Sequence, residues 1–130
     1  MNRLSQFDLK PHHIGIVLPK NIFHEKFTTL TNFDSIQGVY TYFEFKPEFG
    51  LYIEYFTPEG RATNYPKGFN HICYSVNNIL EFKDFQSYVK TERIGKQLTL
   101  LEKSGSAECN KVAFFEINYL GMIEINVLND

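Results

Sequence analysis

Apolar and polar residues alternate in several short stretches of the chain, with the period of two that is typical of half-buried β-strands. Two of these stretches, residues 12–18 and 70–76, begin alike, with a polar residue, a histidine and an isoleucine. Each is followed by apolar residues at helical spacing, over residues 21–30 in the first half and 79–89 in the second. The chain therefore repeats a strand followed by a helix.

Each half then ends in a predicted β-hairpin whose turn contains glycine. The paired strands are 39–45 with 51–56, joined by a turn at 46–50, and 111–117 with 122–128, joined by a turn at 118–121. One weaker strand is expected before each hairpin, at residues 35–39 and 97–102. Each half thus reads as a strand, a helix and three further strands.

This order of elements predicts an α+β fold class with two βαβββ modules, whose sheets form an open cup if they curve toward each other. A length of 130 residues fits one domain, which we place at residues 1–130. Within this domain, module one is expected at about residues 11–57, a linker at residues 58–68 and module two at about residues 69–128.

Strand alternation also places the residues that carry chemistry. Because residues i and i+2 of a strand face the same way, His13 and His71 are expected on the faces opposite to the helices. Glu54 and Glu124 take the corresponding place in the last strand of each half. Two imidazoles and two carboxylates suit a divalent ion such as Zn, Ni, Co, Mn or Fe. A single strand histidine is more often structural, but the repetition of the pair favours a metal site.

Glu44 is a candidate general base beside this site. If Phe45 pairs with Leu51 across the turn, Glu44 lies opposite Tyr52 and on the same face as Glu54. The alternative is a carboxylate that faces solvent, since a bulge in the turn would reverse the face.

Three further residues are candidates for contacts with a substrate. Tyr42 and Tyr52 are expected to line the cup as hydrogen-bond donors, or to serve in packing alone. Arg61, in the linker, is expected to attract an anionic group of the substrate, with a solvated side chain as the alternative. His12 is expected to face away from His13, as neighbouring residues in a strand do.

Charge and composition exclude several classes of function. The net charge is -2 and lysine and arginine do not cluster, which argues against a nucleic-acid partner. No apolar run approaches the roughly 20 residues of a membrane span. The segment Met1–Lys10 lacks the apolar core of a secretion signal, and Cys73 and Cys109 do not make a disulfide framework. We therefore expect a cytoplasmic protein with a small-molecule partner.

Four segments, HHIGIVL, YIEYFTP, GFNHICYSV and GMIEINV, resemble in their order the vicinal oxygen chelate (glyoxalase/bleomycin resistance) superfamily. The resemblance covers residues 11–128 and is greatest to methylmalonyl-CoA epimerase-like glyoxalase domains. It implies metal ligands in the first and fourth strands of each module, where this chain has His13, Glu54, His71 and Glu124. It also implies a homodimer.

By this resemblance the protein is expected to be a metal-dependent isomerase or lyase acting on a small oxygenated acid, ketone or acyl thioester. Glu124 and Glu44 are its candidate catalytic carboxylates. The epimerases carry a glutamate base just before a Gly-Val pair, whereas Ile36 and Gln37 precede this pair here. The alternative is therefore a non-catalytic protein of the same fold that sequesters a small molecule. An iron dioxygenase is a third interpretation, which the four ligands and short chain disfavour.

Overall fold

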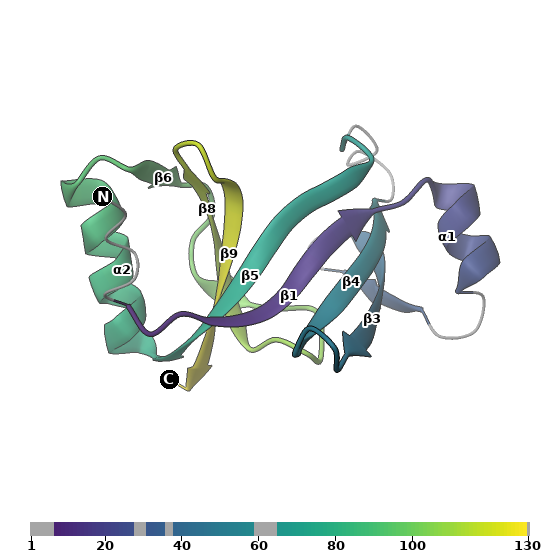
Figure 1. The fold of residues 1–130 in the computed structure, drawn as a ribbon, viewed down its shortest axis with the longest axis horizontal. Coiled ribbons are helices and arrows are strands. Elements are labelled where there is room, and N and C mark those ends of the chain that lie inside the picture. Colours follow the sequence, from purple (N-terminus) through teal and green to yellow (C-terminus); the bar gives the residue numbers. More distant parts are fainter. Residues whose placement is uncertain (1–6, 28–30, 36–37, 59–64, 130) are drawn as a thin grey trace.

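In the computed structural model, nine β-strands of the described residues form one mixed, curled sheet, and two helices pack beside it (Figure 1). The structure describes residues 7–27, 31–35, 38–58 and 65–129. The strands are β1 (Lys10–Val17), β2 (Asn32–Asp34), β3 (Val39–Lys46), β4 (Leu51–Pro58), β5 (Gly68–Asn78), β6 (Gly95–Gln97), β7 (Glu102–Lys103), β8 (Lys111–Ile117) and β9 (Gly121–Asn129). The helices are α1 (Lys20–Lys26) and α2 (Ile79–Thr91). Neither of these helices is long and apolar enough to cross a membrane.

The sheet is built from two related halves that meet at its middle. The strand order is β2-β3-β4-β1-β5-β9-β8-β6, and β7 also pairs with β8. The antiparallel pair β1 and β5 is symmetric about Ile14 and Ile72. Each of these two strands pairs in parallel with the last strand of its own half, β4 or β9. The predicted α+β class with two βαβββ modules is therefore confirmed.

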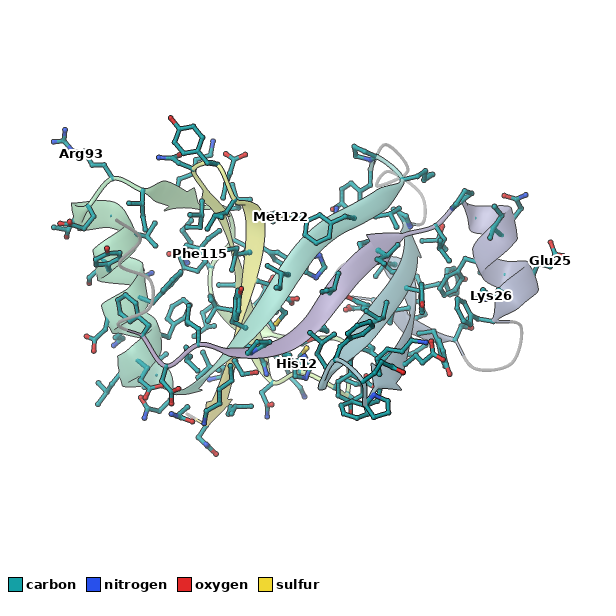
Figure 2. All side chains as sticks on the ribbon, in the orientation of Figure 1. His12, Glu25, Lys26, Arg93, Phe115 and Met122 are labelled. Carbon is teal, nitrogen blue, oxygen red and sulfur yellow. The ribbon has the colours of Figure 1, made fainter. Side chains whose placement is uncertain are left out.

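Module two carries the larger core. Asn78 caps α2 by accepting a hydrogen bond from the backbone N–H of Glu81 at 3.0 Å, and the Glu81 carboxylate accepts one from the N–H of Asn77 at 2.8 Å. The helix then buries three apolar side chains against the sheet, where Phe115 packs edge-on against Phe85 at 5.1 Å between ring centroids. Figure 2 shows Phe115 on the side of the sheet that faces α2.

Module one has a shorter helix than the sequence predicts. The pattern indicated residues 21–30, but α1 ends at Lys26, and residues 28–30 lie outside the described part of the chain. Pro19 occupies the N-cap position and supplies no side-chain cap. Phe23 and Phe27 are the buried contacts of this segment with the rest of the molecule.

The weaker strands lie elsewhere than at residues 35–39 and 97–102. β2 ends at Asp34, because the chain turns there: the N–H of Gly38 donates to the carbonyl of Asp34 at 2.8 Å, and Gly38 has a φ of 71°. In module two the short strands β6 and β7 share only residues 97 and 102 with the expected strand.

The first hairpin also differs from the predicted register. Lys46 pairs with Leu51 and Phe45 with Tyr52, which leaves residues 47–50 in the turn. The expected pairing of Phe45 with Leu51 is therefore wrong by one residue. Because side chains alternate between the two faces, this shift moves Glu44 to the face opposite to the expected one.

Candidate metal centre

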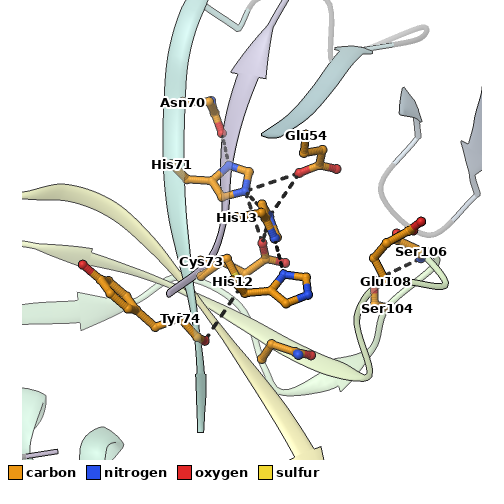
Figure 3. A network of polar contacts seen from close by, with 12 residues as sticks. His12, His13, Glu54, Asn70, His71, Cys73, Tyr74, Ser104, Ser106 and Glu108 are labelled. Carbon is orange, nitrogen blue, oxygen red and sulfur yellow. Dashed lines mark hydrogen bonds and ion pairs between the residues drawn. The ribbon is translucent and has the colours of Figure 1, made fainter. Parts of the chain in front are cut away.

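The side chains of His13, Glu54, His71 and Glu124 meet at the middle of the sheet. They come from β1, β4, β5 and β9, the first and last strands of each module. All four residues are buried, and one nitrogen or oxygen of each lies within 4.8 Å of the others. Figure 3 shows the rings of His13 and His71 and the carboxylate of Glu54 pointing toward one another. The four residues that the sequence singled out are thus adjacent.

The spacing of the donor atoms is that of a coordination shell. Nε2 of His13 lies 3.3 Å from Oε1 of Glu54 and 3.0 Å from Oε1 of Glu124. Nε2 of His71 lies 3.5 Å and 3.2 Å from the same two oxygens, and 3.2 Å from Nε2 of His13. Donors about 2.1 Å from one ion, at angles of roughly 90–110°, lie about 3.0–3.4 Å apart. The donor set therefore fits a first-row divalent ion with little rearrangement.

Electrostatics point the same way. Burial opposes ionisation of Glu54 and Glu124, but hydrogen bonds with the two histidines outweigh it and hold the pKa of each carboxyl below its usual value. Burial likewise opposes the charge on His13 and His71. A hydrogen bond with Cys109, followed by hydrogen bonds with the two carboxylates, raises the pKa of His13, and hydrogen bonds with the carboxylates raise the pKa of His71. The cluster thus balances two negative charges with two protons, and a divalent cation can replace both.

Neighbouring side chains fix the two imidazoles in matching ways. The ring of Phe43 meets His13 edge-on at 5.2 Å between centroids and 89°, and Phe114 meets His71 at 5.4 Å and 85°. Gly15 lies directly beneath the ring of His71, and a Cβ there would overlap it. Each ring is therefore held by an aromatic side chain of its own module.

A cavity of about 340 Å³ opens beside this cluster, and Glu54 and His71 form part of its wall. Its apolar lining consists of Phe56, Tyr65, Leu98, Val112, Phe114 and Met122. Thr41 donates a hydrogen bond of 2.9 Å from its Oγ1 to Oε2 of Glu54, which leaves Oε1 facing the histidines. The cluster can therefore be reached by a small molecule in this cavity.

Two of the predicted site residues lie away from the cavity. Glu44 pairs with Ile53 rather than facing the side of Glu54, and its carboxylate forms an ion pair with Lys46 at 3.1 Å. Tyr42 shares the face of Glu44, and its ring stacks on Phe27 at 4.6 Å between centroids. The expectations that Glu44 is a base at the site and that Tyr42 lines the cup are wrong, because both side chains point to the face that packs on α1.

The other candidates have mixed outcomes. Tyr52 lies beside the ring of His12, 5.5 Å between centroids, and is not among the described residues that line the cavity. Arg61 lies outside the described residues, as do Ile36 and Gln37. The sequence analysis missed the aromatic residues of the cavity wall, because alternation alone does not say which strand faces bend toward one another.

His12 does not face away from His13 as expected. The Nδ1 atoms of the two rings lie 2.7 Å apart, and β1 contains an irregularity between Pro11 and His13 that breaks strict alternation. On the other side of the centre, Nδ1 of His71 lies 2.7 Å from Oδ1 of Asn70. Each histidine of the cluster thus contacts the residue that precedes it in sequence.

No known family profile and no curated protein matches this sequence. Several solved structures match its fold. A hypothetical protein from Bacillus halodurans C-125 is 19% identical over 95% of each chain, with a TM-score of 0.67. Methylmalonyl-CoA epimerase from Mycobacterium tuberculosis is 12% identical over 91% of this chain and 87% of its own, with a TM-score of 0.64.

A variant of Streptomyces coelicolor methylmalonyl-CoA epimerase, solved in complex with 2-nitronate-propionyl-CoA, gives a similar result. It is 15% identical over 92% of this chain and 98% of its own, with a TM-score of 0.62. At these identities the likeness concerns the fold. This chain therefore has the cupped, two-module fold of the methylmalonyl-CoA epimerases, with a buried His/Glu cluster that can bind a metal ion.

Proposed function

We propose that this protein is a metal-dependent isomerase or lyase that moves a proton at a carbon next to a carbonyl group. Its substrate is a small oxygenated acid, a ketone or the acyl end of a thioester. The observation that carries this proposal is the buried set of two imidazoles and two carboxylates in the wall of a cavity. The epimerase fold of the similar structures supports it.

In this proposal His13, Glu54, His71 and Glu124 hold the ion, which is Zn, Ni, Co, Mn or Fe. When bound, a divalent ion polarises a substrate oxygen and stabilises the negative charge that develops as the neighbouring proton leaves. The two histidines supply neutral donors, and the two glutamates balance the charge of the ion. Burial of all four side chains keeps competing water away from the charges.

Glu54 is the best-placed proton acceptor. Of the two carboxylates in the cluster, it is the one that borders the cavity, while Glu44 lies on the other face of its strand. The hydrogen bond from Thr41 orients the carboxylate of Glu54. Glu54 is then both a ligand and the proton acceptor, whereas Glu124, which was a catalytic candidate together with Glu44 in the sequence analysis, is a ligand only. A carboxylate beside the substrate carbon can take up its proton and return it to either face.

The size and lining of the cavity restrict the substrate. A volume of about 340 Å³ is at the small end of known ligand pockets. The rest of the wall is polar or charged and consists of Glu54, Asn70, His71, Thr99, Glu102 and Lys103. This combination suits a compact carbon skeleton that carries one or two oxygens. A long thioester would place only its acyl end here.

The test combines elemental analysis with proton exchange. The purified protein is expected to carry about one divalent ion per chain, and the double variant His13→Ala with Glu124→Ala none. The metal-loaded protein is then incubated in D2O with a panel of acids, ketones and acyl thioesters, and deuterium uptake is followed by NMR. Uptake should stop on chelation and return with metal. Equal uptake by the metal-free protein, or no metal bound after incubation with all five ions, contradicts the proposal.

The apolar lining of the cavity favours one second candidate, a protein that sequesters a flat or compact molecule without chemistry. Aromatic side chains such as Phe56 and Phe114 offer broad contact surfaces for such a ligand. This function predicts tight binding of a compound that is recovered unchanged and without deuterium. Metal-dependent uptake of deuterium into the same compound excludes it.

A further inference from the structure

The pairing of the two central strands is interrupted immediately before His13. On one side Pro11 pairs with Tyr74, and on the other His13 pairs with Cys73, so that His12 is an extra residue on β1. Such a bulge breaks strict alternation and turns neighbouring side chains toward the same side of the sheet. As a result the ring of His12 reaches the ring of His13.

The same interruption occurs a second time, on the other strand. Gly15 pairs with His71, and Ile16 pairs with Phe69, so that Asn70 is an extra residue on β5. The two irregularities are equidistant from the centre of the β1–β5 pair. Each therefore lies immediately before a histidine of the cluster, and each contributes a side chain 2.7 Å from that histidine's Nδ1.

This contact determines which ring nitrogen faces the carboxylates. The Oδ1 of Asn70 is only an acceptor, so the proton of the contact belongs to Nδ1 of His71. In the neutral ring Nε2 then keeps its lone pair, and Nε2 is the atom that lies 3.2 Å from Oε1 of Glu124. His12 can accept the Nδ1 proton of His13 in the same way.

We propose that the bulge residues His12 and Asn70 are positioning residues that hold the Nδ1 proton of His13 and His71 and direct Nε2 of each ring to the metal. The inference rests on the proposed function, because it takes both histidines as ligands. Outer partners of this kind change metal affinity by about 10–100-fold. The Nδ1 of His12 can either donate or accept, whereas the amide oxygen of Asn70 can only accept the proton of His71. The loss of Asn70 is therefore expected to have the larger effect.

The first experiment compares Asn70→Ala with Asn70→Asp, which keeps the acceptor, and with Asn32→Ala as a matched control on the exposed strand β2. Zinc affinity is measured by competition with a chelating dye. We expect Asn70→Ala to bind zinc about 10–100-fold more weakly, and Asn70→Asp and the control to keep the parent affinity. An unchanged affinity of Asn70→Ala, or an equal loss in Asn70→Asp, overturns the proposal.

A second readout needs no metal. In the metal-free protein, 15N-labelled histidine should show the Nδ1 proton of His71 protected from exchange with water in the parent and in Asn70→Asp, but not in Asn70→Ala. If the parent binds no zinc and yet protects this proton, the proposed function fails while the positioning contact stands. If the proton is equally exposed in all variants, the positioning role is excluded.

The bulge at His12 is tested by making it resemble the bulge at Asn70. His12→Asn places an amide oxygen near the position of the lost Nδ1 and should retain zinc binding, whereas His12→Ala should weaken it. Equal affinities of His12→Ala and the parent overturn the role of His12.

Discussion

The two modules contribute equally to the candidate metal centre but are built with different strength. Module two has a helix of 13 residues with a side-chain cap and a core of ten buried residues. Within the described part of the chain, module one has a helix of seven residues without such a cap and a core cluster with three buried members. Each nevertheless supplies one histidine, one glutamate and one phenylalanine to the same point.

The geometry of the site therefore depends on the central strands rather than on the size of the core in each module. The four donor side chains come from β1, β4, β5 and β9, which pair directly with one another. Backbone hydrogen bonds between these strands set the positions of the donors. The helices and outer strands mainly supply stability, and they do so unequally.

The largest loss of stability is expected from a substitution in the core of module two. Phe115→Ala removes a fully buried ring that packs against Phe82 and Phe85, and we expect a loss of about 3–5 kcal/mol in the free energy of unfolding. Phe23→Ala removes an equally buried ring of module one that does not belong to the described core cluster of Val17, Val39 and Phe56, and it should cost less. Urea denaturation measures both. Equal losses would show that the two cores are equally strong.

The second-largest change is expected from a substitution next to the histidines of the candidate metal centre. Gly15→Ala forces a methyl group into the ring of His71, so zinc affinity should fall by about 10–100-fold. Cys73, which pairs with His13 as Gly15 pairs with His71, already carries a side chain. Cys73→Ala is therefore the matched control and should retain zinc binding. An unchanged affinity of Gly15→Ala would mean that His71 moves freely.

The pH dependence of the metal-free protein tests the charge balance. The raised pKa of His13 and His71 stabilises the fold fully below the unfolded value of about 6.5, and this stability is lost as pH rises through the folded values. The lowered pKa of Glu54 and Glu124 stabilises the fold fully above the unfolded value of about 4.3, and this stability is lost as pH falls through the folded values.

The metal-free protein should therefore be most stable between about pH 4.3 and 6.5 and weaken at alkaline pH. Bound zinc should remove the alkaline loss, because it replaces the two protons, and should itself be displaced at low pH. Urea denaturation of both forms across this range measures the effect. A metal-free protein that gains stability above pH 8 would contradict the proposed pairing of the four charges.

The smallest loss of stability is expected from substitutions at the N-termini of the two helices. Asn78→Ala removes the cap of α2 and should cost about 1 kcal/mol. Asn21→Ala, on the exposed surface of α1, removes no cap and should leave stability almost unchanged. Thermal denaturation of the two variants compares the modules directly. A cost at Asn21 as large as that at Asn78 would contradict the difference in capping.

The two-module arrangement and the identity of the four candidate ligands could be predicted from the sequence. Alternation and the repeated strand-and-helix pattern identified the two modules, since burial of one face imposes a period of two on a strand. The repeated pairs of His13 with Glu54 and His71 with Glu124 followed from the same pattern, and the structure places all four together.

The register of the first hairpin and the bulges in β1 and β5 could be seen only in the three-dimensional structure. The turn at residues 47–50 is one residue shorter than expected, and that single step moved Glu44 away from the site. The bulges at His12 and Asn70 broke the alternation on which the sequence argument relied. Register and bulges depend on how strands distant in sequence pair and twist, and the period of apolar residues along one strand contains no information about its partner.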